Sequence, residues 1–168
     1  MVEKKAPIKV RFYRFKNRLK EKTAGLGGEV KAISAEALAK AEAALSDMSE
    51  DYPDWVGKLI DQLDGIHNEC LEEGADRKVL FDKINAISHD MKGQGGTFGY
   101  PLITTFSDSL YTFSYSKGEL TDDHVKVIKA HIDAMRAVIK GRVSGDGGEI
   151  GEQLTEGLKQ AIGKYKIR

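Results

Sequence analysis

The sequence predicts an all-α protein, and three features support that prediction. Apolar residues recur at steps of three and four along most of the chain, which places them on one face of a helix. Residues that favour helix starts, such as Ser34, Asp76 and Pro101, stand at the beginnings of these segments. No segment of comparable length alternates in the manner of a β-strand.

Composition indicates one domain with extensions. The chain has 168 residues, of which 40% are apolar, enough for a core. Its one cysteine, Cys70, cannot form an internal disulfide, which favours a reducing compartment. No apolar run approaches the length of a membrane span, and the N-terminus lacks the apolar stretch of a secretory signal. We therefore expect a cytoplasmic protein with no membrane span.

The net charge of zero conceals an uneven distribution. Residues 1–33 carry ten Lys and Arg against three Asp and Glu, whereas residues 34–140 carry eleven against nineteen. We expect three parts: a basic N-terminal arm at 1–33, a helical bundle at 34–140, and a glycine-rich linker with a C-terminal amphipathic helix at 141–168. The apolar spacing of the arm fits both a strand and a helix, and the arm either packs on the acidic bundle or binds an anionic partner.

The first half of the bundle region predicts two helices. Ser34 caps a helix that reaches about Asp47, with an inner face of Leu38, Ala41, Leu45 and Met48. Pro53 lies in the first turn of a second helix, which continues to about Glu73 and stops at Gly74. The apolar stripe of that second helix is Trp55, Leu59, Leu63, Ile66 and Cys70.

Four further helices follow. Asp76 caps the third, which ends at Gly99 and has the apolar stripe Leu80, Ile84, Ile87, Met91 and Phe98. The fourth begins at Pro101 and closes at Lys117-Gly118, with the inner face Leu102, Phe106, Leu110 and Phe113. Thr121 caps the fifth, whose stripe is Val125, Ile128, Ile132, Met135 and Ile139. The second to fifth helices predict an antiparallel four-helix bundle with short turns. A last helix with Ile150, Leu154, Leu158, Ala161, Ile162 and Tyr165 must bury its face on this bundle, on a second copy or on a partner.

One polar face of the third helix carries the strongest functional signal. His89 lies opposite the apolar stripe, and Lys92, Gly93 and Gly96 follow on its side of the helix. Each of the glycines between residues 93 and 99 weakens a helix by about 1 kcal/mol, a loss that fits close approach of another molecule. The spacing matches neither a dinucleotide fingerprint nor a P-loop, so a glycine loop that binds phosphate directly is excluded.

The arrangement of His89, Lys92, Gly93 and Gly99, at +3, +4 and +10, resembles the His-x-x-Lys-Gly…Gly signature of histidine-containing phosphotransfer (HPt) domains of bacterial phosphorelays. The surrounding helical pattern extends the resemblance to about residues 34–140. It implies an HPt-like four-helix bundle in which Nε2 of His89 accepts and donates a phosphoryl group. The implied partners are receiver domains of response regulators and a hybrid sensor histidine kinase.

The resemblance also implies roles for neighbouring residues. Lys92 would stabilise charge on the transferred phosphoryl group, and Gln94 would donate a hydrogen bond to it or fix the imidazole ring. Gly93, Gly96 and Gly99 would leave room for a docking partner.

We expect no cofactor on this chain, because Mg²⁺ would be held by the partner receiver domain. The chain has no ATP-binding segment, so we expect a phosphocarrier without kinase activity of its own. No nucleic acid is expected as a partner under this hypothesis. The alternative is a small helical adaptor that binds nucleic acid or anionic lipid through its basic arm, with His89 incidental.

The remaining polar residues give weaker signals. His67 and Cys70 stand three apart, but two ligands are too few for a metal site, and a core cysteine beside a partly exposed histidine explains them better. We expect His124 and His131 at the surface and Asp90 in solvent. Hydrolase chemistry is not expected, since no histidine stands at helical spacing from Thr97, Ser107 or Ser109 to form a nucleophile–base pair.

Overall fold

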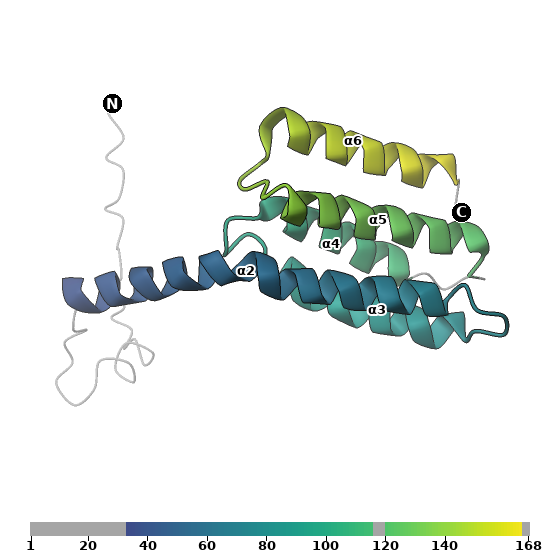
Figure 1. The fold of residues 1–168 in the computed structure, drawn as a ribbon, viewed down its shortest axis with the longest axis horizontal. Helices are drawn as coiled ribbons and strands as arrows, with labels where there is room; N and C mark the ends of the chain where they lie inside the picture. Colours follow the sequence, from purple (N-terminus) through teal and green to yellow (C-terminus); the bar gives the residue numbers. More distant parts are fainter. Residues whose placement is uncertain (1–32, 116–119, 166–168) are drawn as a thin grey trace, which may run out of the picture. The chain divides into compact units, whose positions relative to one another are not determined.

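The computed structural model describes residues 33–115 and 120–165, and these residues form helices and turns without strands (Figure 1). The helices are α2 (Ala35–Glu69), α3 (Arg77–Lys92), α4 (Pro101–Ser114), α5 (Asp122–Lys140) and α6 (Gly148–Lys164). The prediction of an all-α protein is therefore confirmed. The chain divides into two compact units, residues 1–40 and 41–168. Most of the basic arm, the expected end of the fourth helix at Lys117-Gly118 and the last three residues lie outside the described residues.

Helix α2 corrects the expectation of two separate helices at 34–47 and 53–73. Ser34 caps it as predicted, with its hydroxyl accepting from the Ala37 N–H at 3.1 Å. Pro53, however, lies inside the continuous helix. A proline there removes one backbone hydrogen bond, at a cost of about 3 kcal/mol. Tertiary packing offsets that cost, because Pro53 and its neighbour Tyr52 are both buried and the Tyr52 ring stacks on Phe98, with centroids 4.8 Å apart.

The buried face of α2 differs from the predicted stripe. Trp55 is 42% exposed, and the residues facing the core are instead Tyr52, Val56, Ile60, Leu63, Ile66 and Cys70. The true stripe is thus rotated by about one residue at its N-terminal end. The expected inner face of residues 34–47 is also wrong, because Leu38, Ala41, Leu45 and Met48 are exposed.

The predicted apolar stripes of α3, α4 and α5 meet in one core. Its fully buried side chains include Phe81, Ile84, Met91, Ile103, Phe106, Leu110, Ile128, Ile132 and Met135. Helix α3 packs on α4, and α4 packs on α5. The N-cap Asp76 is confirmed, since its carboxylate accepts from the Val79 N–H at 3.2 Å. The end of α3 is not confirmed: the helix stops at Lys92, and the glycine-rich residues 93–99 form hydrogen-bonded turns instead.

Ion pairs join α2 to α5 on the outside of this core. Arg136 contacts Asp61 at 2.7 Å and Asp64 at 3.1 Å, while Lys129 contacts Asp64 at 3.0 Å. Burial raises the pKa of the Asp64 carboxyl, but Lys129 and Arg136 more than offset this effect, so its pKa lies below the ordinary value.

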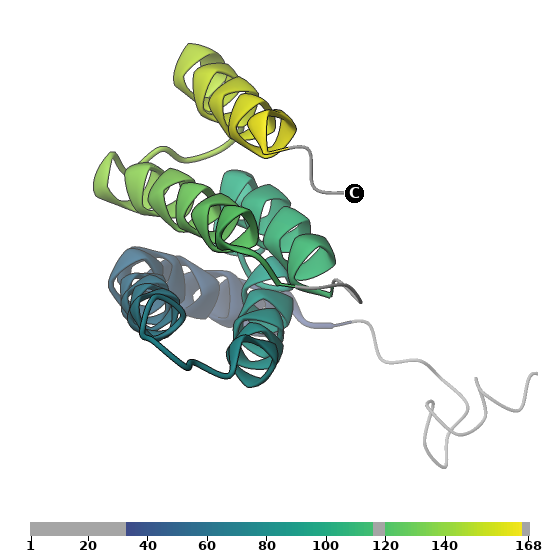
Figure 2. The same cartoon turned by 90° about the vertical axis from the view of Figure 1, so that its right-hand side faces the viewer.

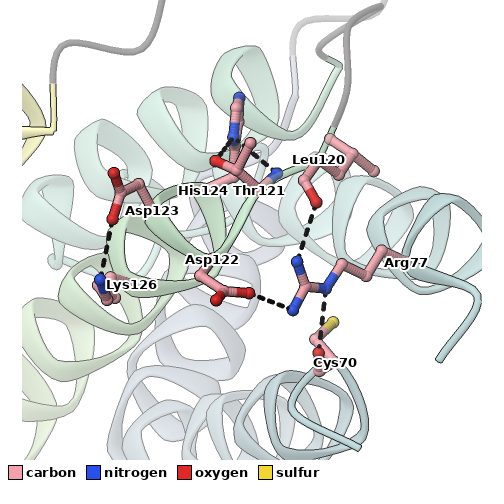
Figure 3. Close-up of polar contacts among 8 residues, drawn as sticks. All are labelled: Cys70, Arg77, Leu120, Thr121, Asp122, Asp123, His124 and Lys126. Carbon is pink, nitrogen blue, oxygen red and sulfur yellow. Dashed lines mark hydrogen bonds and ion pairs between the residues drawn. The ribbon is translucent and has the colours of Figure 1, made fainter. Parts of the chain in front are cut away.

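Arg77 connects three segments of the chain (Figure 3). Its Nε donates to the Cys70 carbonyl at 3.2 Å and one terminal nitrogen to the Leu120 carbonyl at 3.0 Å. The other terminal nitrogen pairs with Asp122 at the start of α5. In the same view Thr121 is the N-cap of α5, as predicted, and its N–H donates to Nδ1 of His124 at 3.2 Å. A single guanidinium therefore ties the turn after α2 to the residues that begin α5.

Helix α6 buries its apolar face on α5, which answers where this last helix packs. Both Figure 1 and Figure 2 place it on the side of α5 that faces away from α3. The predicted glycine-rich linker within residues 141–168 is short, since α5 ends at Lys140 and α6 already begins at Gly148. Gly151 lies in the first turn of this helix, and crowding requires a glycine there, because a Cβ would lie 2.0 Å from the Asp146 carbonyl oxygen. Leu158 is the buried centre of the α6 face, whereas Ile150 is exposed.

Candidate functional site

His89 is exposed on the outer face of α3, three residues before the end of the helix. Its two neighbours in the helix differ in burial, as the 3.6-residue period predicts: Ser88 is buried and Asp90 is exposed. The chain contains four histidines, and the other three, His67, His124 and His131, are buried. His89 is therefore the one imidazole that a macromolecular partner can reach without unfolding the protein.

The ring of Tyr111 on α4 lies beside His89, with centroids 5.3 Å apart and a tilt of 48°. The backbone next to Tyr111 is fixed to α3 by Asn85, one turn before His89. The Asn85 side-chain amide donates to the Tyr111 carbonyl at 2.7 Å and contacts the Ser114 hydroxyl at 3.0 Å. These bonds set the register of α4 against α3, and with it the position of the aromatic ring beside the imidazole.

Lys92 lies one turn after His89 and contacts two groups of α4. Its Nζ is 4.0 Å from the centroid of the Tyr111 ring and 3.1 Å from a carboxylate oxygen of Asp108. Asp108 is 60% exposed, so the ion pair is weak and open to competition. A cation held over an aromatic face, next to an exposed imidazole, provides positive charge close to any group that the imidazole binds.

The glycines that follow His89 differ in whether packing or backbone conformation requires a glycine at that position. A Cβ at Gly95 would lie 2.7 Å from the Tyr100 carbonyl oxygen and 2.8 Å from the Thr104 amide, so packing demands a glycine there. Gly99 has a φ of +82°, a conformation that favours glycine. At Gly93 and Gly96, by contrast, a Cβ would meet nothing closer than 3.6 Å. The docking roles predicted for Gly93, Gly96 and Gly99 stay predictions, but only Gly93 and Gly96 lack an internal reason to be glycine.

Gln94 lines a groove together with Tyr52 and Phe98. The groove has a volume of about 510 Å³, and Met48, Asp51 and Trp55 complete its lining. The Gln94 Oε1 and the Tyr52 hydroxyl are both buried, and neither has a hydrogen-bond partner among the described residues. The predicted hydrogen bond from Gln94 to a phosphoryl group or to the imidazole stays a prediction.

The expected surface positions of the other histidines are wrong. His131 is fully buried between α4 and α5: its Nδ1 donates to the Val127 carbonyl at 2.8 Å, and its Nε2 lies 2.9 Å from the Ser109 hydroxyl. This serine–histidine contact crosses between helices, which is why spacing along one helix could not find it. Burial lowers the pKa of both His131 and His124. Both rings pack against the Phe113 ring, with centroid distances of 5.9 Å for His131 and 5.7 Å for His124.

The expectation that His67 is partly exposed is likewise wrong, since only 6% of the residue is accessible. Cys70 is buried as predicted, and burial raises the pKa of its thiol. Across residues 33–115 and 120–165, no three His, Cys, Asp or Glu side chains gather closely enough to hold a metal ion.

Sequence reasoning missed three members of the site: Asn85, Asp108 and Tyr111. Asn85 stands four residues before His89 on the same helix face, a signal that helical spacing alone could have supplied. Asp108 and Tyr111 are on α4, and only the register of α4 against α3 brings them to Lys92.

Comparisons of the chain with protein-family models, with curated proteins and with solved structures found no match. None of the described helices combines the length and apolar character needed to cross a membrane.

Proposed function

We propose that this protein is a histidine phosphotransfer carrier, in which His89 accepts a phosphoryl group and passes it on in a His–Asp phosphorelay. Its partners would be receiver domains of response regulators and a hybrid sensor histidine kinase in the cytoplasm. The observation that carries the proposal is the exposure of His89 one turn from Lys92, beside Gly93 and Gly96, whose missing side chains are not required by the packing of residues 33–115 and 120–165.

In this proposal α2 to α5 form the antiparallel four-helix bundle of phosphotransfer domains, with α6 added to α5. The packing of α3 on α4 and of α4 on α5 supports this arrangement, as do the ion pairs from Asp61 and Asp64 of α2 to α5. The apolar core then fixes the helices, while the polar face of α3 stays free for a partner.

The proposed step is a transfer from an aspartyl phosphate. The Nε2 lone pair of a neutral His89 attacks phosphorus, and an N–P bond forms as the bond from phosphorus to the aspartyl oxygen breaks. The aspartate leaves as a carboxylate with the bonding electron pair, and the imidazole hydrogen remains on Nδ1 during the attack. Return transfer reverses each of these changes. Catalysis of this kind depends on positioning and on charge stabilisation, with Mg²⁺ supplied by the receiver domain.

Lys92 would stabilise the charge on the transferred group. Its Nζ lies over the Tyr111 ring, and the same ring lies beside His89, so the ammonium is close to where a phosphoryl group on Nε2 would be. A phosphoryl group carries more negative charge than the exposed Asp108 carboxylate and would compete with it for the ammonium.

The test is phosphate incorporation. The purified protein is incubated with a hybrid kinase and ATP, or with a phosphorylated receiver domain, and acid-labile, base-stable label is followed. We expect label on the wild type and on Asp90→Asn, a matched change at the exposed neighbour, and none on His89→Gln. Because His89 is exposed, circular dichroism of His89→Gln should match the wild type. Label that persists on His89→Gln, or no label with several donors, would refute the proposal.

A further inference from the structure

A groove lies between α2 and the turns that follow α3. It has a volume of about 510 Å³ and is lined by Met48, Asp51, Tyr52, Trp55, Gln94 and Phe98. Tyr52 is 2% exposed and stacks on Phe98, with centroids 4.8 Å apart, whereas Met48 and Trp55 are 55% and 42% exposed. The groove therefore has a packed aromatic base and an apolar rim that a second molecule can reach.

Three oxygen-bearing groups of this groove lack a partner among the described residues. The Tyr52 hydroxyl and the Gln94 Oε1 are buried and make no hydrogen bond within residues 33–115 and 120–165. The Asp51 carboxylate is exposed, and no base in the same ranges pairs with it. A buried oxygen without a partner is destabilising, so a molecule that donates hydrogen bonds here is favoured over one that accepts them.

The charge around the groove is negative and is not neutralised by the described part of the chain. Residues 41–57 contain no Lys, Arg or His but five exposed acids, Glu42, Asp47, Glu50, Asp51 and Asp54. None of the five forms an ion pair with a described residue. Further along the same helix, Asp61 and Asp64 instead pair with bases of α5. The field at the groove therefore attracts a cation.

We infer that this groove binds an arginine side chain from a basic segment of a partner protein. A guanidinium is planar, so it can stack on the indole of Trp55 while its N–H groups donate to the Asp51 carboxylate. These two residues stand four apart on one helix face, which places them side by side. The apolar stem of the arginine would pack on Met48. Lysine fits less well, because its ammonium is a point charge without a planar fork.

The spread of the acids indicates a peptide segment rather than a small molecule. From Glu42 to Asp54 they extend over about 18 Å of the helix, at a rise of about 1.5 Å per residue. Only an extended ligand with several positive charges can neutralise them together. The same acids repel nucleic acid and anionic lipid, so a basic protein segment is the occupant that the charges fit.

The test uses Trp55, the one tryptophan of the chain, whose fluorescence reports on the groove. The full chain is titrated with a lysine–glycine peptide that has one central arginine, and with matched peptides in which citrulline or lysine replaces that arginine. We expect the arginine peptide to change the Trp55 emission and to bind at least about threefold more tightly than either matched peptide. His89→Gln should bind it like the wild type, because the groove does not include the proposed phosphoryl acceptor.

Three further variants test the residues of the groove. Asp51→Asn should weaken binding of the arginine peptide by about two- to fivefold, the contribution of one exposed ion pair. Asp82→Asn, which removes the same charge at an exposed position of α3 outside the groove, should bind like the wild type. Trp55→Ala, followed by calorimetry, should no longer distinguish arginine from lysine. All three positions are exposed, and circular dichroism would verify that the variants fold.

Equal affinity for the citrulline and arginine peptides, equal losses in Asp51→Asn and Asp82→Asn, or no response to any peptide would overturn the inference. Quenching of Trp55 by acrylamide provides a further check in the free chain. Quenching as weak as that of a buried tryptophan would also overturn it, because another segment or a second copy would then cover the groove.

Discussion

The ammonium group of Lys92 lies 4.0 Å from the centroid of the Tyr111 ring, and the same ring lies 5.3 Å from that of His89. Tyr111 thus contacts both residues on which the proposed chemistry depends. It comes from a different helix, so the relative placement of α3 and α4 determines the geometry of the site. The bonds from Asn85 to the Tyr111 carbonyl and to Ser114 maintain that placement.

We expect Tyr111→Ala to slow phosphoryl transfer to His89 by about two- to fivefold, because an exposed cation–π contact contributes about 0.5 to 1 kcal/mol. Tyr111→Phe should transfer at close to the wild-type rate, since it retains the aromatic face. Rapid-quench measurements with a phosphorylated receiver domain would give both rates. Equal slowing in the two variants would mean that the hydroxyl matters and the ring does not.

Gly93→Leu should separate stability from function. Space for a side chain exists at Gly93 and its φ is −74°, so we expect the free energy of unfolding to rise by up to about 1 kcal/mol. Transfer to and from a receiver domain should nevertheless fall, because the side chain would stand where the partner must dock. Gly157→Leu on α6, which also has open space, is the matched control for the rate. Normal exchange by Gly93→Leu would contradict the docking role.

Gly95→Ala should behave in the opposite way. The added Cβ would come within 2.8 Å of backbone atoms of Tyr100 and Thr104, which cannot move aside as a side chain can. We expect a loss of about 1 to 3 kcal/mol in urea denaturation, the usual range for overpacking. A substitution without effect on unfolding would mean that the turn after α3 can open at little cost.

Arg77→Ala should destabilise the fold by on the order of 2 kcal/mol, because two backbone carbonyls and Asp122 lose a charged donor. Arg77→Lys should recover only part of this loss, since an ammonium cannot reproduce the fork of a guanidinium. Phosphate incorporation at His89, measured well below the melting temperature of each variant, should be unchanged. Loss of incorporation in a folded Arg77→Ala would show that the contacts of Arg77 influence the site.

Acid should destabilise the protein through its buried histidines. Burial lowers the pKa values of His131 and His124, so the unfolded chain binds more protons than the folded one as pH falls below the ordinary histidine value of 6.5. Their contribution to stability is complete above that pH and declines on acidification. Asp64, whose pKa is also lowered, adds a loss in the same direction at lower pH. Thermal unfolding between neutral and mildly acidic pH should show a falling midpoint, and His131→Gln should flatten this dependence.

Sequence patterns predicted the helices that bury one clear stripe. The inner residues of α5, such as Val125 and Met135, are buried as expected, because a face with a three-and-four period can pack in only one orientation. The same reasoning failed at Pro53, where packing of Tyr52 and Pro53 overrides a local break, and at Trp55, where two neighbouring stripes of α2 are both apolar.

The candidate site was predictable only where it depends on one helix. The exposure of His89 follows from its position opposite Ile84 and Met91, both fully buried. The contacts of Lys92 with Asp108 and Tyr111 depend on the register of α4 against α3, and residue spacing along the chain does not determine that register. The burial of His131 also depends on a neighbouring helix, since its partner Ser109 lies on α4.

The burial of His67, His124 and His131 gives the protein a single chemically addressable imidazole. A reagent that acylates imidazoles should therefore modify one histidine of the folded chain, and peptide mapping should locate that adduct at position 89. An occupied Nε2 cannot react, so once the reaction with free His89 is complete, the fraction left unmodified at this residue measures the molecules that carry a ligand on this nitrogen. Mass spectrometry of this adduct would therefore measure the fraction of molecules with a ligand on His89, without isotopes or antibodies.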